Sequence, residues 1–134
     1  MQVYNKILVT IDCSPVDDAI VDHVSALALQ NSAHVYLLHV IHSHTLDQDR
    51  ILRMKAQEAL NTQHEKLLAK QIEASIIIKS GEPDREIIKE IESGQYDLVA
   101  MATHGHTFLE DLLFGSVSRS LKHRISTPLL LIRP

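Results

Sequence analysis

The sequence predicts an α/β protein built on one doubly wound, parallel sheet of five strands in three layers. Short apolar runs rich in β-branched residues alternate with longer stretches whose apolar residues recur at helical spacing, which is the pattern of consecutive βαβ units. The composition is 45% hydrophobic but only 4% aromatic, as expected for an aliphatic sheet that helices cover on both faces.

The first half of the chain contains two strand–helix units. Ser14 is a favourable N-cap, and Pro15 fits the first position of the helix that follows. The polar stretch HSHTLDQD after the second strand is expected to be irregular. The expected elements are a strand at 6–11, a helix from Pro15 to Asn31-Ser32, a strand at 34–41 and a helix from about Asp49 to Lys70.

The second half of the chain continues the same alternation. Pro83 opens a helix after the turn Ser80-Gly81-Glu82, and Ser93-Gly94 ends it. No linker, low-complexity segment or internal repeat interrupts the pattern, so residues 1–134 are expected to form a single domain. The remaining expected elements are strands at 74–79, 98–101 and 129–132 and a helix at about 116–124.

Charge and cysteine content narrow the class of protein. Thirteen basic against seventeen acidic residues give a net charge of −4, so broad electrostatic binding to nucleic acid or to an anionic membrane is not expected. A single cysteine excludes an intrachain disulfide and is typical of a reducing compartment. With no apolar run of about 18 residues and no signal-like start, we expect a soluble, cytoplasmic protein.

The stretch from Tyr96 to Ser118 carries the main functional signal. An apolar strand leads into a loop that contains Gly105, and Gly115-Ser116 precedes the next helical pattern. Such a loop directs several backbone N–H groups and a hydroxyl at one anion, which is the arrangement of a phosphate site. The alternative is a simple helix-start turn, because Gly-Ser is also an ordinary capping pair.

A family resemblance supports the first interpretation. The spacing Gly105-x9-Gly115-Ser116 resembles the nucleotide-binding motif of the universal stress proteins, G-x2-G-x9-G-[S/T], with Ala102 at the position of the first glycine. The segments ILVTIDCS, LLHV, GEP and TPLLLI also match that family, in order and over essentially the whole chain.

The resemblance implies a specific fold, ligand and site. The fold is the Rossmann-like, adenine nucleotide alpha hydrolase-like one, with strand order 3-2-1-4-5. The implied ligand is an adenine nucleotide such as ATP or AMP, bound with Mg²⁺. The implied protein is a dimer that acts in the stress response or in signalling. The implied nucleotide-binding residues are Thr10 and Val40 beside the base, and Met101, Gly105, His106, Gly115, Ser116, Val117 and Ser118 along the ribose and phosphates.

Asp12 is expected at the same place. In that strand order it follows the first strand at the switch point, where α/β sheets bind ligands. Its carboxylate is suited to a ribose hydroxyl or to nucleotide-bound Mg²⁺, and the alternative is that it only caps the turn. Two departures from the family motif oppose a triphosphate: the methyl group of Ala102, and Phe108 with the acidic pair Glu110-Asp111 in the loop.

Other chemistries have weaker support. Four histidines that follow two of the strands are candidate metal ligands: His42, His44, His104 and His106. No cysteine or nearby carboxylate completes the ligand spacing of a metal site. His39 and His104 also resemble family positions whose histidines pack or bond a loop. Cys13 is expected to be a tolerated small residue. There is no G-x-S-x-G motif and no P-loop lysine, so we assign no catalytic residue and expect hydrolysis to be slow at most.

The last strand predicts self-association. Leu129 to Ile132 is an apolar run that would form an open edge of the sheet, and an exposed apolar edge is unfavourable in a soluble monomer. Pairing across a two-fold axis would cover it, and the resemblance implies dimers of this kind. We therefore expect a homodimer through Leu129–Ile132.

Overall fold

The predicted parallel sheet is present. The computed structural model describes residues 3–102, 121 and 125–133. The strands are parallel and lie in the order β3-β2-β1-β4-β5, which confirms the expected topology. The elements are β1 (Lys6–Thr10), α1 (Val16–Asn31), β2 (His34–Ile41), α2 (Leu46–Ala69), β3 (Ala74–Ser80), α3 (Pro83–Gly94), β4 (Leu98–Ala102) and β5 (Leu129–Ile132). The loop and most of the helix expected after β4 lie outside the described residues.

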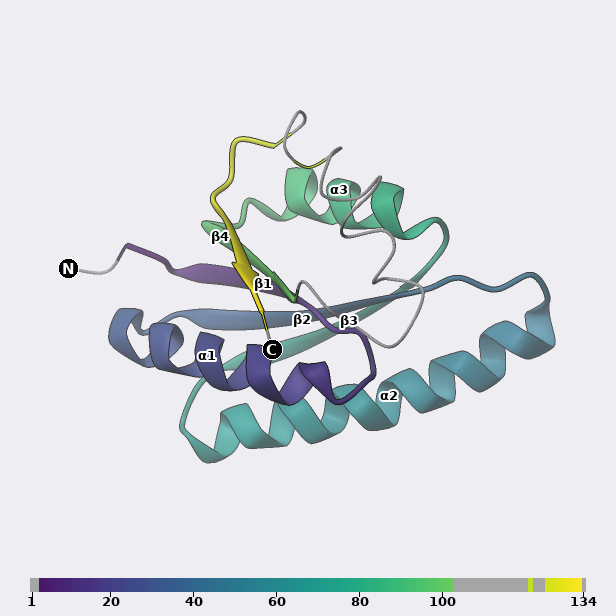
Figure 1. Ribbon diagram of the computed structural model, residues 1–134, viewed down its shortest axis with the longest axis horizontal. Helices are drawn as coiled ribbons and strands as arrows, with labels where there is room; N and C mark the ends of the chain where they lie inside the picture. Colours follow the sequence, from purple (N-terminus) through teal and green to yellow (C-terminus); the bar gives the residue numbers. More distant parts are fainter. Residues whose placement is uncertain (1–2, 103–120, 122–124, 134) are drawn as a thin grey trace.

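Helices cover both faces of the sheet. α1 and α2 lie on one face and α3 on the other (Figure 1). Because side chains alternate along a strand, Ile7 and Val9 of β1 pack toward α1 and α2, whereas Leu8 packs with the isoleucines of α3. All five residues of β4 are buried, as expected for a central strand with both faces covered. Among the described residues, no helix has the length and hydropathy needed to cross a bilayer.

The start of α1 differs from the expectation. Pro15 is the N-cap residue, no side chain caps the helix, and the buried Ser14 Oγ has no hydrogen-bond partner within the described part of the chain. The prediction of Ser14 as the cap is therefore wrong. Asp17 in the first turn binds the preceding loop, where its two carboxylate oxygens accept from the N–H groups of residues 12–14.

The start of α2 also differs. The helix begins at Leu46, so residues 46–48, expected to precede the helix, are helical. Thr45 is the N-cap, and its Oγ1 accepts a hydrogen bond of 3.0 Å from the backbone N–H of Gln48. The Gln48 side chain in turn accepts from the N–H of His44, the residue before the cap, at 2.8 Å, so two side-chain hydrogen bonds set this boundary.

Candidate functional site

The candidate site lies where β1 and β4 end side by side. Val9 of β1 is in register with Ala100 of β4, and β2 and β5 lie on the outer sides of this pair. The sheet order therefore reverses between β1 and β4, and this is the position at which open α/β sheets bind ligands.

Three of the residues predicted for this site share one face of the sheet. Val40 and Met101 belong to the apolar cluster on the α3 side, and Thr10 follows Leu8 of the same cluster by two residues. All three are buried. They form an apolar floor with one hydroxyl group, near the carboxyl ends of three adjacent strands. The predicted residues Gly105, His106, Gly115, Ser116, Val117 and Ser118 lie outside the described residues.

Ala102 does not occupy that face. It is the last residue of β4, is buried, and packs in the cluster on the α1 and α2 side. Its φ is not among the positive values of the described residues, so its backbone is one that any L-residue adopts. The methyl group that distinguishes this chain from the family motif therefore points away from the face that carries Thr10, Val40 and Met101.

Asp12 lies at the top of β1 and is only 6% exposed. The loop that contains it is held by Asp17, which the sequence prediction did not identify. Asp17 Oδ1 accepts from the Asp12 N–H at 2.8 Å, and Oδ2 accepts from the N–H groups of Cys13 at 2.8 Å and Ser14 at 3.2 Å. Three consecutive backbone donors thus converge on one carboxylate. The only sequence signal was an acidic residue in the first turn of the helix, which is common for a different reason, the helix dipole.

Burial controls the ionisation of this loop. It raises the pKa of Asp17 to about 6, and the charge of Asp12 adds to the rise, while the three N–H donors act against it. Burial, followed by the charges of Asp17 and Asp12, raises the pKa of the Cys13 thiol to about 12. Cys13 is therefore a neutral thiol at physiological pH. It also adopts a left-handed backbone with φ of 63°, the conformation that glycine favours.

His39 supports the loop from β2. Its Nδ1 lies 2.6 Å from the carbonyl oxygen of Ile11. A carbonyl only accepts, so Nδ1 carries the hydrogen. Burial lowers the pKa of His39, which favours this neutral form. The structure thus agrees with the expected role in bonding a loop, and the bond fixes the residue immediately before Asp12.

The described residues provide no metal cluster. Groups of three or more His, Cys, Asp or Glu side chains placed to hold an ion are absent from residues 3–102, 121 and 125–133. His42 and His44 contact each other with ring centroids 5.3 Å apart, and His42 Nδ1 lies 3.8 Å from a Glu82 oxygen. His104 and His106, the other two candidates, lie outside the described residues.

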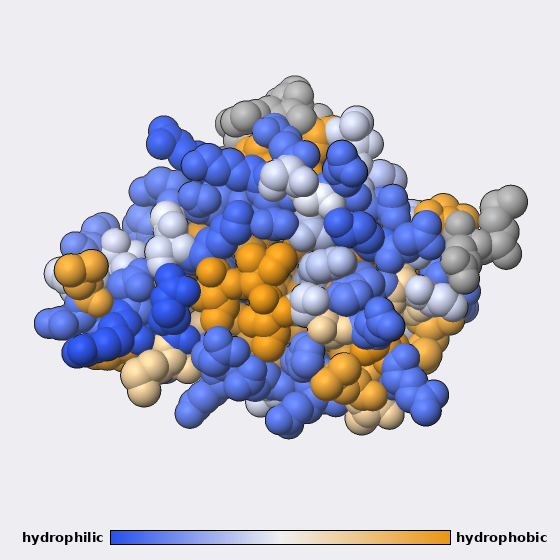
Figure 2. All heavy atoms as spheres, turned by 180° about the vertical axis from the view of Figure 1, so that it is seen from behind, coloured by the Kyte–Doolittle hydropathy of each residue, from blue (hydrophilic) through white to orange (hydrophobic). Residues whose placement is uncertain are grey.

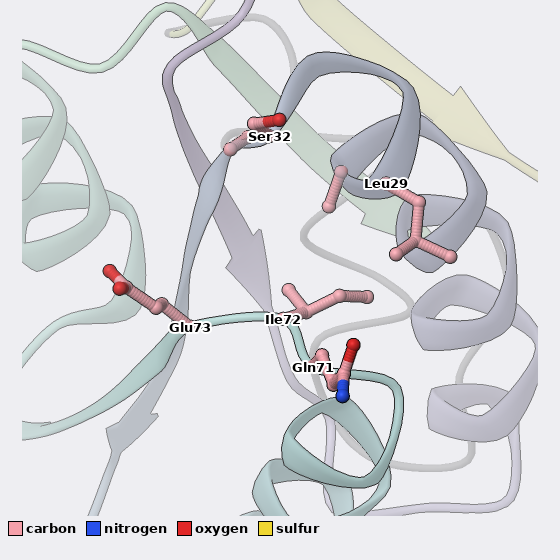
Figure 3. Close-up of a pocket in the computed structure, with 7 residues that line it drawn as sticks. Leu29, Ser32, Gln71, Ile72 and Glu73 are labelled. Carbon is pink, nitrogen blue, oxygen red and sulfur yellow. The ribbon is translucent and has the colours of Figure 1, made fainter.

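Two of the hollows among the described residues lie at opposite ends of the sheet. A groove of about 320 Å³ borders Cys13, Ser14 and Asp17 on the side of α2. A cavity of about 280 Å³ lies at the opposite, amino end of the strands, between the last turns of α1 and α2, where Leu29, Ser32, Gln71, Ile72 and Glu73 line it (Figure 3). Only the first adjoins the loop of Asp12, so the second is remote from the switch point.

A family model supports the resemblance independently. The model described as "Universal stress protein family" matches residues 3–133. The universal stress protein MJ0577 of Methanocaldococcus jannaschii is 28% identical over 154 residues, an alignment that covers 97% of this chain and 95% of the relative.

Solved structures agree with this assignment. The structure of MJ0577 aligns with a TM-score of 0.82 at 27% identity and covers 98% of this chain and 97% of its own. A universal stress protein in complex with cAMP aligns with a TM-score of 0.74 at 17% identity, covering 98% of both chains. A universal stress protein from Archaeoglobus fulgidus in complex with dAMP aligns with a TM-score of 0.72 at 20% identity, covering 98% of this chain and 99% of its own. The last two likenesses show a shared fold.

Proposed function

Because this chain belongs to the universal stress protein family, we propose that it binds an adenine nucleotide and acts in the cytoplasm as a dimeric stress-response or signalling module. The observation that carries the proposal is the site itself. A buried carboxylate on an anchored loop lies at the switch point, beside the apolar floor of Val40 and Met101. An apolar floor suits a purine base, and a carboxylate suits a ribose hydroxyl.

Two further observations support the proposal. Relatives of the same fold have been solved with cAMP and with dAMP, which share the adenine base and one phosphate. The methyl group of Ala102 packs on the other face of the sheet, so it does not crowd the floor. In this proposal ATP or AMP binds with its base near Thr10 and Val40, and Gly105, His106 and Gly115 to Ser118 contact the ribose and phosphates. Asp12 contacts the ribose or nucleotide-bound Mg²⁺.

Calorimetric titration with ATP and Mg²⁺ tests the proposal. We expect saturable binding to the wild-type protein and about 10- to 100-fold weaker binding to Asp12→Asn, because a charge-assisted hydrogen bond is lost. Asp18→Asn is the matched control, since Asp18 lies on the exposed side of α1 and pairs with Lys66. Gly115→Val tests the loop separately. Circular dichroism confirms that each variant is folded.

The same titration separates the alternatives. If millimolar ATP gives neither heat nor a thermal shift with the wild-type protein, the nucleotide proposal fails, and a family member that acts only through protein contacts remains. If ATP binds, phosphate release with and without Mg²⁺ tests the second candidate, a slow ATPase that uses Asp12 and a cation. Turnover that requires Mg²⁺ and disappears in Asp12→Asn would support that enzyme.

A further inference from the structure

The outer edge of β3 is an apolar surface. β3 lies at one end of the sheet, opposite β5, and pairs only with β2 among the described strands. Its seven residues contain neither proline nor glycine, and Ile76, Ile77 and Ile78 are only half-buried. Figure 2 shows the apolar surface that gathers over this strand, surrounded by polar residues. A flat edge of this kind is a template for pairing with another strand.

The hydrogen bonds of β3 identify the backbone groups at this edge. The Val35 N–H of β2 donates to the Glu73 carbonyl at 2.9 Å, and the Gly81 N–H donates to the Ile41 carbonyl at 2.9 Å. In a strand, the N–H and C=O of one residue point to the same side, and this side alternates along the chain. Odd-numbered residues from 73 to 81 therefore bond β2, and even-numbered residues present their N–H and C=O groups to the outer edge.

The two ends of this edge are covered by side chains. His64 Nε2 of α2 lies 2.8 Å from the Ala74 carbonyl oxygen. At the other end, the Ser80 hydroxyl donates to Asp49 at 2.6 Å and accepts from Arg53 at 2.7 Å. These contacts leave Ile76 and Ile78 as the central residues whose backbone groups face outward.

We propose that the β3 edge pairs with the β3 edge of a second copy of this chain, antiparallel and about a two-fold axis at Ile77. In this register Ile76 of one copy lies opposite Ile78 of the other. Such a pair exchanges both of its N–H···O=C bonds, so the two symmetric pairs form four hydrogen bonds that use the exposed groups of both residues. Ile77 meets Ile77 of the second copy on the axis, which makes the interface isologous.

The charges at the ends of the strand favour the antiparallel orientation. Glu73 precedes β3 and is 85% exposed, and Lys79 lies near its end, where it also pairs with Glu90. Antiparallel pairing places Lys79 diagonal to Glu73 of the second copy on the same face of the sheet, within reach of long side chains. Parallel pairing would instead set like charges beside each other. This interface is separate from the dimer proposed through β5, because it uses the opposite edge of the sheet.

Amide hydrogen exchange on the wild-type protein tests the proposal directly. The N–H groups of Ile77 and Lys79 bond β2, so we expect them to be protected at every concentration. Those of Ile76 and Ile78 are expected to exchange at least about tenfold more slowly at millimolar than at micromolar protein, because only the second copy covers them. Rapid exchange of Ile76 and Ile78 at both concentrations would overturn the proposal.

Sedimentation of variants gives a second readout. Ile78→Pro removes an N–H that faces outward and leaves the bonds to β2 intact, as proline at a sheet edge does. In a Leu131→Lys background, in which a charge blocks the β5 edge, we expect a dimer, and we expect the Leu131→Lys/Ile78→Pro double variant to be a monomer. A Leu131→Lys protein that is monomeric up to millimolar concentration would exclude β3 pairing. If Ile78→Pro does not fold, the exchange experiment on the wild-type protein decides.

Discussion

At the scale of single residues, Asp17 has the largest structural role that the sequence did not indicate. Asp17→Ala leaves three loop N–H groups without their acceptor, and we expect it to lower the free energy of unfolding by about 3 kcal/mol. Asp18→Ala removes an exposed ion pair with Lys66 and is expected to cost less than about 1 kcal/mol. Urea denaturation measures both. Equal losses in the two variants would show that Asp17 does not hold the loop.

His39 predicts a pH dependence of stability. Burial lowers its pKa in the folded state, so below its ordinary value of 6.5 the unfolded chain takes up a proton that the folded protein resists. The stabilisation is complete above pH 6.5 and is lost as the pH falls toward the folded-state pKa. His39→Gln keeps a donor for the Ile11 carbonyl but does not titrate.

The measurement is thermal or urea unfolding between pH 7.5 and 5.5, a range that spans about one pH unit on either side of the ordinary histidine value. We expect the wild-type protein to lose more stability than His39→Gln over this range. His23→Gln, at an exposed position of α1, is the control and is expected to follow the wild type. Identical pH profiles for the wild type and His39→Gln would contradict the assignment.

Residue types near the predicted site could be inferred only in part. The position of Asp12 after an apolar strand follows from the sequence pattern, whereas the family resemblance implied Thr10 and Met101 as site residues. The role of Asp17 could not be inferred, because an acid in the first turn of a helix is also explained by the helix dipole. The direction of the Ala102 side chain could not be inferred either, because it depends on whether β4 continues for one more residue.

At the scale of elements, the hydrophobic pattern located each described strand and helix; strand ends differ by at most one residue, and the larger errors lie at helix starts. Thr45 precedes a polar stretch that hides the first turn of α2, and the cap became evident only from its bond to Gln48. Ser14 and Pro15 match the preferred residues of a helix start, but the Ser14 hydroxyl bonds no group of the described residues, and the Asp17 carboxylate binds the loop N–H groups of residues 12–14. Residue propensity alone does not determine which side chains bond the backbone at such boundaries.

At the scale of the whole molecule, alternation of strands and helices predicts a doubly wound sheet, but it leaves the strand order open. The family resemblance implied the order, and the structure confirms it. Composition predicts that both faces of the sheet are covered, but it does not predict what contacts the two edge strands, β3 and β5. These are the surfaces on which assembly depends, and they differ in length and in their exposed side chains.

The β5 edge carries the prediction for the proposed family-type dimer. Leu131 is 47% exposed on β5. In an Ile78→Pro background, we expect Leu131→Lys to weaken the remaining dimer by about 100-fold, because it places two like charges in an apolar contact. Leu46→Lys is the control, since Leu46 is 90% exposed at the start of α2. Sedimentation equilibrium measures the mass, and an unchanged dimer in the Ile78→Pro/Leu131→Lys double variant would show that β5 is not the interface.

The anchored loop after β1 has a consequence for the kinetics of binding. Ordering a backbone costs about 1–2 kcal/mol of conformational entropy per residue, and the bonds from Asp17 and His39 place this loss in the folding step. A ligand that reaches Asp12 therefore contacts a loop whose backbone is already ordered. We therefore expect the rate of association to be limited by encounter and orientation, with no preceding rearrangement of the residues from Ile11 to Ser14.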